Sequence, residues 1–376
     1  MSIFKYEIKK LLFSPALLIF IVLCLGFNII ISSSGWFYDY PDYIAEASKT
    51  TGYKLGAEFD EKLAGLEPDE FRALLAEETA GVTDIFDDYN SAYIAEAYIN
   101  RLGLMGYAAD AMRNKYAQFQ KAVDKKAETD ESLSLYFAGA TTYMHKNLHS
   151  ETMSVLLLEC GLLSALIMLL SIGYEQHNRT SHIVYATKTG RKIMSYKLFA
   201  SLTAGLTAFA VLTVLTLAVY FVFNDYGNVW GSSVSNVFHY ILDIFAGKRP
   251  FITWQSYTAA TYLLAALGIT ALLTVCFGLM AFVIGMWVKN SYVGFLLFVI
   301  VNAGCVVFSF VASGLPQFFA VLTPVWLWLK RGIWFTDGGA DILWKSFETL
   351  GGFASLLMLA GLCAISAITF RKRDIA

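Results

Sequence analysis

The chain has 376 residues, of which 57% are hydrophobic and only 15% are charged, and its formal net charge is −2. Soluble globular proteins carry about a quarter of charged residues. This composition therefore excludes a disordered chain, a basic nucleic-acid-binding protein and most soluble enzymes. The five cysteines all lie in apolar runs, which argues against a disulfide framework and against a thiolate zinc site.

Long apolar runs, each with at most one charged residue, predict an all-α polytopic membrane protein with six transmembrane helices. About 20 apolar residues, rising 1.5 Å each, cross a hydrocarbon core of about 30 Å. The runs that satisfy this length are residues 11–31, 152–173, 198–223, 259–288, 290–313 and 349–370. A further run at 315–329 is too short to span and contains Pro316 and Pro324, so short outer helices are expected over 315–335.

The distribution of lysine and arginine predicts cytoplasmic N- and C-termini. The short inner segments hold twelve basic residues in 43 positions, and they are residues 1–10, 174–197, 289–291 and 371–376. The short outer loops 224–258 and 314–348 hold five basic residues in 70 positions. This bias predicts a multi-pass protein of the cell membrane, and the style of the sequence suggests a bacterial one.

Three parts follow along the chain. Residues 1–34 are expected to form an N-terminal interfacial helix, with apolar side chains on one face, and transmembrane helix 1. Residues 35–151 carry 21 acidic and 11 basic side chains, a balance of −10, and their apolar residues recur at three- and four-residue intervals. They are expected to form an extracellular helical domain whose charge could attract cationic peptides, although a solvated acidic surface explains the charge equally well. Residues 152–376 carry helices 2–6.

Motifs of catalysis and nucleotide binding are missing from the sequence. The segment nearest to a phosphate-binding loop, residues 186–192, lacks the first glycine and the final hydroxyl residue. No sequence motif of a metalloprotease or an intramembrane protease occurs. We therefore expect no catalytic residue, no cofactor and no metal site in this chain.

Three side chains invite a functional interpretation. Glu159 is the one ionisable residue expected inside a span, so it is a candidate for substrate contact or gating; the alternative is a buried hydrogen-bond partner. His145 and His149 stand four residues apart and would share a helical face. Two ligands do not make a metal site, so this pair is expected to form a polar helix surface.

The loop over residues 174–197, YEQHNRTSHIVYATKTGRKIMSYK, is the most informative segment. A topology-setting basic loop would explain its lysines and arginines but not the rest of its pattern. With the N-terminal helix and six spans, the pattern resembles the permeases of ABC-2 type transporters. The matching residues are Glu175, Thr180, Thr187, Gly190, Arg191 and Lys197. The outer segment from Leu315 to Trp326 is similar to short outer helices of that family.

The resemblance implies a transmembrane subunit of an ATP-driven ABC transporter that exports or clears an amphipathic peptide, lipid or drug. A separate cytoplasmic ABC ATPase subunit would bind ATP and magnesium, and a second permease chain, identical or related, would complete the pathway. Residues 174–197 would then be the coupling loop. Glu175, Gly190, Arg191 and Lys192 would be its main contact residues, with Thr180, Thr187 and Lys197 belonging to the same motif.

Two other functions stay open on the sequence. A membrane sensor or assembly scaffold with a ligand-binding ectodomain would need no ATPase. A polytopic membrane enzyme is disfavoured, because the sequence offers no cluster of His, Asp, Glu or Ser at the membrane face. An ATPase encoded beside this gene would favour the permease, whereas a neighbouring kinase or regulator alone would favour the sensor.

Overall fold

The computed structural model describes residues 3–33, 39–87, 89–136, 141–187, 190–288, 290–312 and 315–372. Among these residues, six helices are long and apolar enough to cross a membrane, as predicted. They are α2 (Pro15–Ser32), the helix over Tyr143–His177, the helix over Gly190–Phe223, α12 (Ala259–Trp287), α13 (Ser291–Val311) and α16 (Phe347–Lys372). Lys188, Lys289 and Arg373, which contribute to the predicted charge bias, lie outside the described residues.

The second and third spans each begin with shorter helical segments. α8 (Thr141–His145) and the π-helical turns η2 (Lys146–Thr152) lead without a break into α9 (Met153–His177). The turn η3 (Gly190–Lys192) leads into α11 (Ile193–Phe223). The polar region therefore continues as helix into the second span.

Helices α9 and α12 form the centre of the bundle. They pack along each other, with α11 and α13 against α9 and with α16 against α12. Glycines allow the close approach: a Cβ on Gly161 would lie 2.8 Å from the Phe277 ring, and one on Gly285 would lie 2.9 Å from Ile172. Most side chains of α2, α11, α13 and α16 face outward, as expected of helices covered by lipid.

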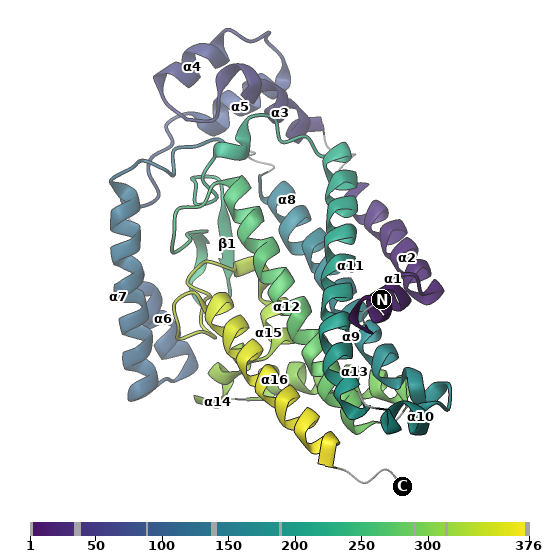
Figure 1. Ribbon diagram of the computed structural model, residues 1–376. Coiled ribbons are helices and arrows are strands. Elements are labelled where there is room, and N and C mark those ends of the chain that lie inside the picture. Colours follow the sequence, from purple (N-terminus) through teal and green to yellow (C-terminus); the bar gives the residue numbers. More distant parts are fainter. Residues whose placement is uncertain are drawn as a thin grey trace.

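The two ends of the bundle carry different helices (Figure 1). One end carries the amphipathic helix α1 (Ile3–Leu12), the short helix α10 (Ser181–Ala186) and the end of α16. The opposite end carries the polar helices, which are α3 (Asp39–Thr51), α4 (Ala57–Ala64), α5 (Glu70–Thr79), α6 (Ser91–Leu102) and α7 (Tyr107–Ala127). We call these the inner end and the outer end, after the predicted orientation.

The outer end is assembled from three parts of the chain rather than from residues 35–151 alone. The core around α6 and α7 includes Ile252, Trp254, Ala340 and Leu343 from the two loops that were expected to be short connections. The Phe119 ring packs edge-on against Trp254, with 4.7 Å between centroids. These loops cannot be treated as linkers, because they complete the hydrophobic core of the polar region.

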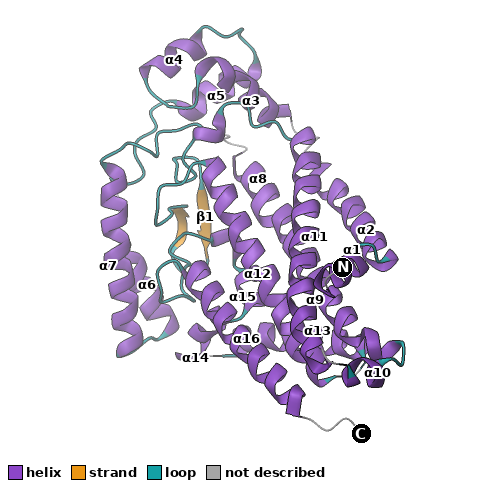
Figure 2. Ribbon diagram, viewed as in Figure 1, coloured by secondary structure: helices purple, strands orange, loops and turns teal. Residues whose placement is uncertain are grey.

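A short hairpin interrupts the otherwise helical fold of the described residues (Figure 2). Strands β1 (Tyr240–Asp243) and β2 (Gly247–Pro250) pair antiparallel, with Tyr240 opposite Pro250. Each strand has only four residues, which is too short to give a periodic pattern in the sequence. The turn η4 (Val229–Gly231) precedes this hairpin.

The segment before the last span forms short helices, as predicted. They are α14 (Leu315–Phe318), η5 (Phe319–Leu322), α15 (Pro324–Leu329) and η6 (Arg331–Ile333). Pro324 occupies the first turn of α15, where its missing N–H costs no hydrogen bond.

Candidate functional site

The predicted coupling loop folds into α10 between two turns. The Thr180 N–H donates to the Glu175 carbonyl oxygen over 2.8 Å, which closes the first turn. The Thr187 hydroxyl donates to the Val184 carbonyl oxygen over 2.7 Å and accepts from the Gly190 N–H over 3.2 Å. Thr180 and Thr187 therefore close the two turns of the loop. Both hydroxyl groups donate to its backbone, although the side chain of Thr187 is exposed.

Gly190 is required by the backbone of the second turn. Its φ is +46°, a conformation that disfavours side chains, and it is buried. A Cβ at this position would lie 3.2 Å from the Tyr185 carbonyl oxygen. The glycine of the sequence motif thus supports the connection between α10 and α11.

Glu175 and Lys197 form a buried ion pair that ties the end of α9 to the start of α11. The Lys197 ammonium also donates to the Ser171 carbonyl oxygen. Both side chains are almost fully covered, at 6% and 0% exposure. Glu175 therefore braces the end of α9 against the start of α11 from below the surface of the loop.

Helix α1 extends this charged cluster. Its Glu7 and Lys10 pair over 2.5 Å, and the Lys10 ammonium lies 3.9 Å from the centre of the Tyr174 ring. α1 also packs along α11. The N-terminal helix is therefore part of the same assembly as the start of the loop.

Arg191 joins the loop to the end of the last span. Its Nη1 donates to the Arg371 carbonyl oxygen over 2.7 Å, and Arg371 in turn donates to the Ser195 hydroxyl over 3.2 Å. The rings of Tyr185 and Phe370 meet edge-on at 5.7 Å. A cation at the carbonyl end of a helix satisfies its free acceptors and its dipole. No local pattern in the sequence indicates this contact, since its partners lie 180 positions apart.

The outward surface of the loop consists of other residues. No side chain of α10 is buried, and Ile183 is 71% exposed, beside the exposed His182 and Ala186. Lys192 is also exposed. Among the residues expected to contact an ATPase, Lys192 is exposed. Glu175 and Gly190 are buried beneath the loop. Arg191 contacts the end of α16. Sequence reasoning missed Ile183, whose exposure depends on how α10 is held.

Glu159 lies in a buried polar contact between three spans. The Asn28 amide of α2 donates to Glu159 Oε2 of α9 and to Thr216 Oγ1 of α11, each over 2.9 Å. Both Asn28 and Thr216 are buried. The structure thus gives Glu159 the surroundings of a hydrogen-bond partner, the alternative to a pathway residue. A lone asparagine within an apolar run was the available signal for this contact.

The histidine pair was wrongly expected to form a helix surface, because His145 and His149 are both buried. Their ring centroids lie 4.6 Å apart, and His239 from the outer loop approaches His145 to 4.3 Å. His239 Nδ1 lies 2.9 Å from the Val234 carbonyl oxygen, and burial lowers the pKa of His239 to about 4. Within the described ranges, no group of His, Cys, Asp and Glu side chains is arranged to hold a metal ion.

Buried charges join α7 to the two outer loops. The Lys115 ammonium donates to the carbonyl oxygens of Asp337, Gly339 and Ile342 over 2.7–3.1 Å. Arg249 donates to Asp337 Oδ1 over 2.9 Å. Burial lowers the pKa of Lys115 to about 7. Burial alone would raise the pKa of Asp337, but Arg249 and Lys115 outweigh it and hold that pKa below its ordinary value.

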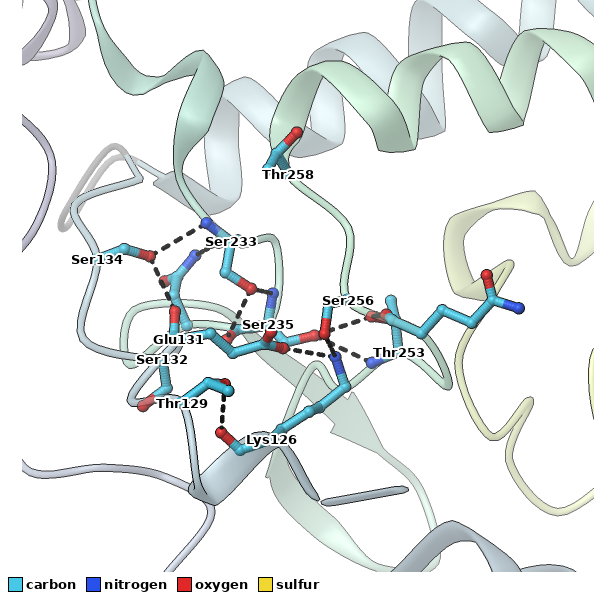
Figure 3. Close-up of polar contacts among 12 residues, drawn as sticks. Lys126, Thr129, Glu131, Ser132, Ser134, Ser233, Ser235, Thr253, Ser256 and Thr258 are labelled. Carbon is cyan, nitrogen blue, oxygen red and sulfur yellow. Dashed lines mark hydrogen bonds and ion pairs between the residues drawn. The ribbon is translucent and has the colours of Figure 1, made fainter. Parts of the chain in front are cut away.

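A second group of polar contacts lies where α7 ends (Figure 3). Lys126 pairs with Glu131 over 2.5 Å and donates to the Ser256 hydroxyl over 3.2 Å. The Ser233 N–H donates to the Ser134 hydroxyl over 3.2 Å. A pocket of about 450 Å³ opens beside these contacts, and its lining includes several hydroxyl groups. The outer end therefore offers a cavity suited to a polar ligand.

Comparison of the chain with protein-family models, with curated proteins and with solved structures found no match.

Proposed function

We propose that this chain is the transmembrane subunit of an ATP-driven transporter of the ABC-2 type, which exports or clears an amphipathic substrate. A separate cytoplasmic ATPase would supply the energy by docking on α10. The observation that carries this proposal is the arrangement of α10, which presents an uncovered surface while its two ends are braced to the bundle.

The bracing supports a mechanical role for the loop. A displacement of α10 would reach α9 and α11 through the buried pair of Glu175 and Lys197. It would reach α16 through Arg191. Packed elements transmit such shifts because close-packed interiors yield little to compression. A partner that moves α10 can therefore move three spans together.

An amphipathic substrate is supported by a pocket at the inner end, between α1, α9 and the start of α13. The pocket has a volume of about 440 Å³ and is lined by both polar and apolar side chains. Lys10, His177 and Asn290 contribute the polar part, whereas Leu17 and Leu170 contribute to the apolar part. A molecule with a polar head and a hydrocarbon body would match this division.

The outward apolar faces of α2, α13 and α16 are compatible with a second permease chain in the membrane. Such a partner, identical or related, would complete a pathway between two copies.

Co-purification tests the docking of an ATPase. The tagged chain is extracted from its native membrane in mild detergent, and bound proteins are identified by mass spectrometry. The chain should retain an ABC ATPase, and Ile183→Glu should lose it, because a buried contact would receive an unpaired charge. Ile244→Glu is the matched control, since Ile244 is 94% exposed on the outer hairpin. Absence of any ATPase from the unmodified sample would refute the proposal.

A ligand-binding ectodomain of a sensor is the second candidate, and the hydroxyl-lined outer pocket favours it. The same purification separates the two functions. A kinase or regulator recovered without an ATPase, and retained in Ile183→Glu, would establish the sensor and remove the permease.

A further inference from the structure

Four segments that are distant in the sequence meet at the pocket of about 450 Å³ at the outer end. They are residues 53–55, 133–135, 232–234 and 257–259, of which the first two pair antiparallel, as do the last two. The Leu55 N–H donates to the Leu133 carbonyl oxygen over 3.1 Å. The Ser233 N–H joins the two pairs by donating to the Ser134 hydroxyl over 3.2 Å. Backbone contacts between these segments therefore fix the walls of the pocket.

The pocket lies where a membrane-spanning helix begins. Thr258, in its wall, is the residue immediately before α12 and caps that helix, since its hydroxyl accepts from the Thr261 N–H over 3.3 Å. α12 is one of the helices that are long and apolar enough to cross a membrane. A pocket at its end is therefore close to one membrane surface, which dissolved molecules and lipid headgroups both reach.

The charged groups at the pocket balance. Its lining includes Asp130, Glu131 and Lys54. Glu131 pairs over 2.5 Å with Lys126, which lies directly behind it. These two anions and two cations leave no net charge at the pocket. A ligand with a net charge gains no long-range attraction from such a site, so the pocket favours a neutral ligand.

Polar side chains at the pocket can both donate to a ligand and accept from it. The Ser256 hydroxyl is exposed and accepts from Lys126 Nζ over 3.2 Å (Figure 3), so its own hydrogen is available for a ligand. The Thr129 hydroxyl donates to the Lys126 carbonyl oxygen over 2.8 Å, so it presents its lone pairs. The exposed Asp130 carboxylate accepts only. This mixture suits a molecule that carries several hydroxyl groups, because each of them both donates and accepts.

Two partly exposed tyrosine rings belong to the same lining, Tyr53 and Tyr257. A Cβ at Gly231 would lie 2.8 Å from the Tyr53 ring, so a larger residue there would displace the ring. The Tyr257 ring packs against Phe335, with 5.0 Å between centroids. Both rings are thus held in place by their neighbours. The C–H face of a sugar ring packs on such aromatic rings while its hydroxyl groups meet polar side chains.

Asp130 has an uncommon backbone conformation at the edge of the pocket. Its φ is +48°, which is unfavourable for residues other than glycine. The turn at this residue brings Thr129, Asp130 and Glu131 into the same lining. Strained residues cluster at binding sites. The strain at Asp130 therefore agrees with a carboxylate that is held ready for a ligand.

We propose that this pocket binds an uncharged pyranose sugar, with Asp130 accepting from its hydroxyl groups and Tyr53 covering one face of its ring. The volume of about 450 Å³ lies within the range of about 300–1,000 Å³ for small-molecule sites. Dissolved saccharides and glycolipid headgroups share this ring chemistry. The inference goes beyond the proposed function, because sugar binding at the outer end does not depend on an ATPase at α10.

Saturation-transfer NMR tests the site on the full chain in nanodiscs whose lipids carry no sugar. The neutral probes are the methyl glycosides of glucose, galactose and mannose, which differ in the orientation of single hydroxyl groups. Glucosamine and glucuronic acid carry the same ring with a positive or a negative charge. At least one neutral sugar should receive saturation from the protein, and neither charged sugar should bind more tightly than it does.

Two variants and a control locate the binding. Asp130→Gly should weaken binding of the neutral sugar about tenfold, as expected for hydrogen bonds to a carboxylate. The same variant should not lower the unfolding midpoint, because glycine adopts this φ without strain. Tyr53→Leu should weaken binding about fivefold by removing the aromatic face. Tyr93→Leu is the control, since Tyr93 is 70% exposed on α6, outside the pocket, and should bind as the unmodified chain does.

Several outcomes would overturn the proposal. Absence of saturation transfer to all three neutral sugars would refute it. Tighter binding of glucosamine would refute it as well, and would assign the pocket to a cationic ligand such as a basic peptide. Unchanged binding in Asp130→Gly would remove the contact assigned to that carboxylate.

A further arm distinguishes the two sources of the sugar. A glycosyl diacylglycerol with the sugar that binds is added to the nanodiscs. Loss of the signal from the dissolved glycoside would support a lipid headgroup as the ligand, whereas an unchanged signal would support a dissolved saccharide. Absence of an ATPase in the co-purification experiment would leave either result unaffected.

Discussion

The inner and outer ends of the molecule are both held by buried charges, but the partners come from very different distances in the sequence. At the inner end, Glu175 and Lys197 are 22 positions apart and flank one loop. At the outer end, Lys115 contacts residues more than 220 positions away. The buried pair at the inner end therefore closes one local loop, which the end of α16 contacts through Arg191, whereas the buried charges at the outer end join three distant segments directly. This contrast suits a loop that receives a displacement and an outer region that resists one.

Removing one charge from the buried group of Lys115, Arg249 and Asp337 at the outer end should have the largest effect on stability. Asp337→Ala leaves Arg249 buried without its closest carboxylate, 2.9 Å away, and should lower the free energy of unfolding by about 5 kcal/mol. The measurement is thermal unfolding in detergent together with proteolysis of the outer end. Arg113→Gln is the control, because the Arg113–Glu96 pair between α7 and α6 is exposed, and its loss should change neither readout. An equally mild result for both variants would contradict the role assigned to Asp337.

Breaking the inner pair should have a smaller and more local effect. Lys197→Met leaves Glu175 buried without its cation, which should lower the free energy of unfolding by about 3 kcal/mol. We expect a smaller loss of stability than for Asp337→Ala, because Glu175 lies within about a turn of the end of α9, where water approaches. Hydrogen exchange should show loosening confined to the loop and to α1.

The double replacement Glu175→Met with Lys197→Met sharpens this test. It removes both charges, so most of the lost stability should return. If the double variant were as unstable as Lys197→Met alone, the loss would come from packing rather than from the unpaired charge.

The pH dependence of the free energy of unfolding should come from the outer end. The pKa of His239 is about 4 in the folded chain, against about 6.5 when unfolded. Between these values the unfolded chain binds the additional proton, so stability should fall by about 2.5 kcal/mol as pH decreases from 6.5 to 4. His239→Phe keeps the ring that stacks on Phe251 at 4.0 Å and removes the titrating group.

The comparison is the unfolding midpoint of both proteins across this pH range. The unmodified chain should lose more stability than His239→Phe on acidification. Parallel profiles would show that the histidine does not titrate in this way.

The candidate site was only partly predictable, and the reason is visible in particular residues. The segment 174–197 was recognisable as a distinctive loop because its polar composition contrasts with the runs on either side. The roles of Glu175 and Arg191 were not, since burial against Ser171 or against the end of α16 depends on helices from elsewhere in the chain. Ile183 carried no signal at all, because an isoleucine in a short helix is equally suited to a core or to a contact surface.

The sequence by itself determined the six spans, the short helices before the last one and the segregation of polar residues, because each depends on the summed hydropathy of about 20 neighbouring residues. Only the tertiary structure decided which polar groups meet. It brought His239 to His145, Asn28 to Glu159 and Arg249 to Asp337. Such pairs are set by how whole helices and loops pack, and a single sequence contains no local pattern that specifies contacts over these separations.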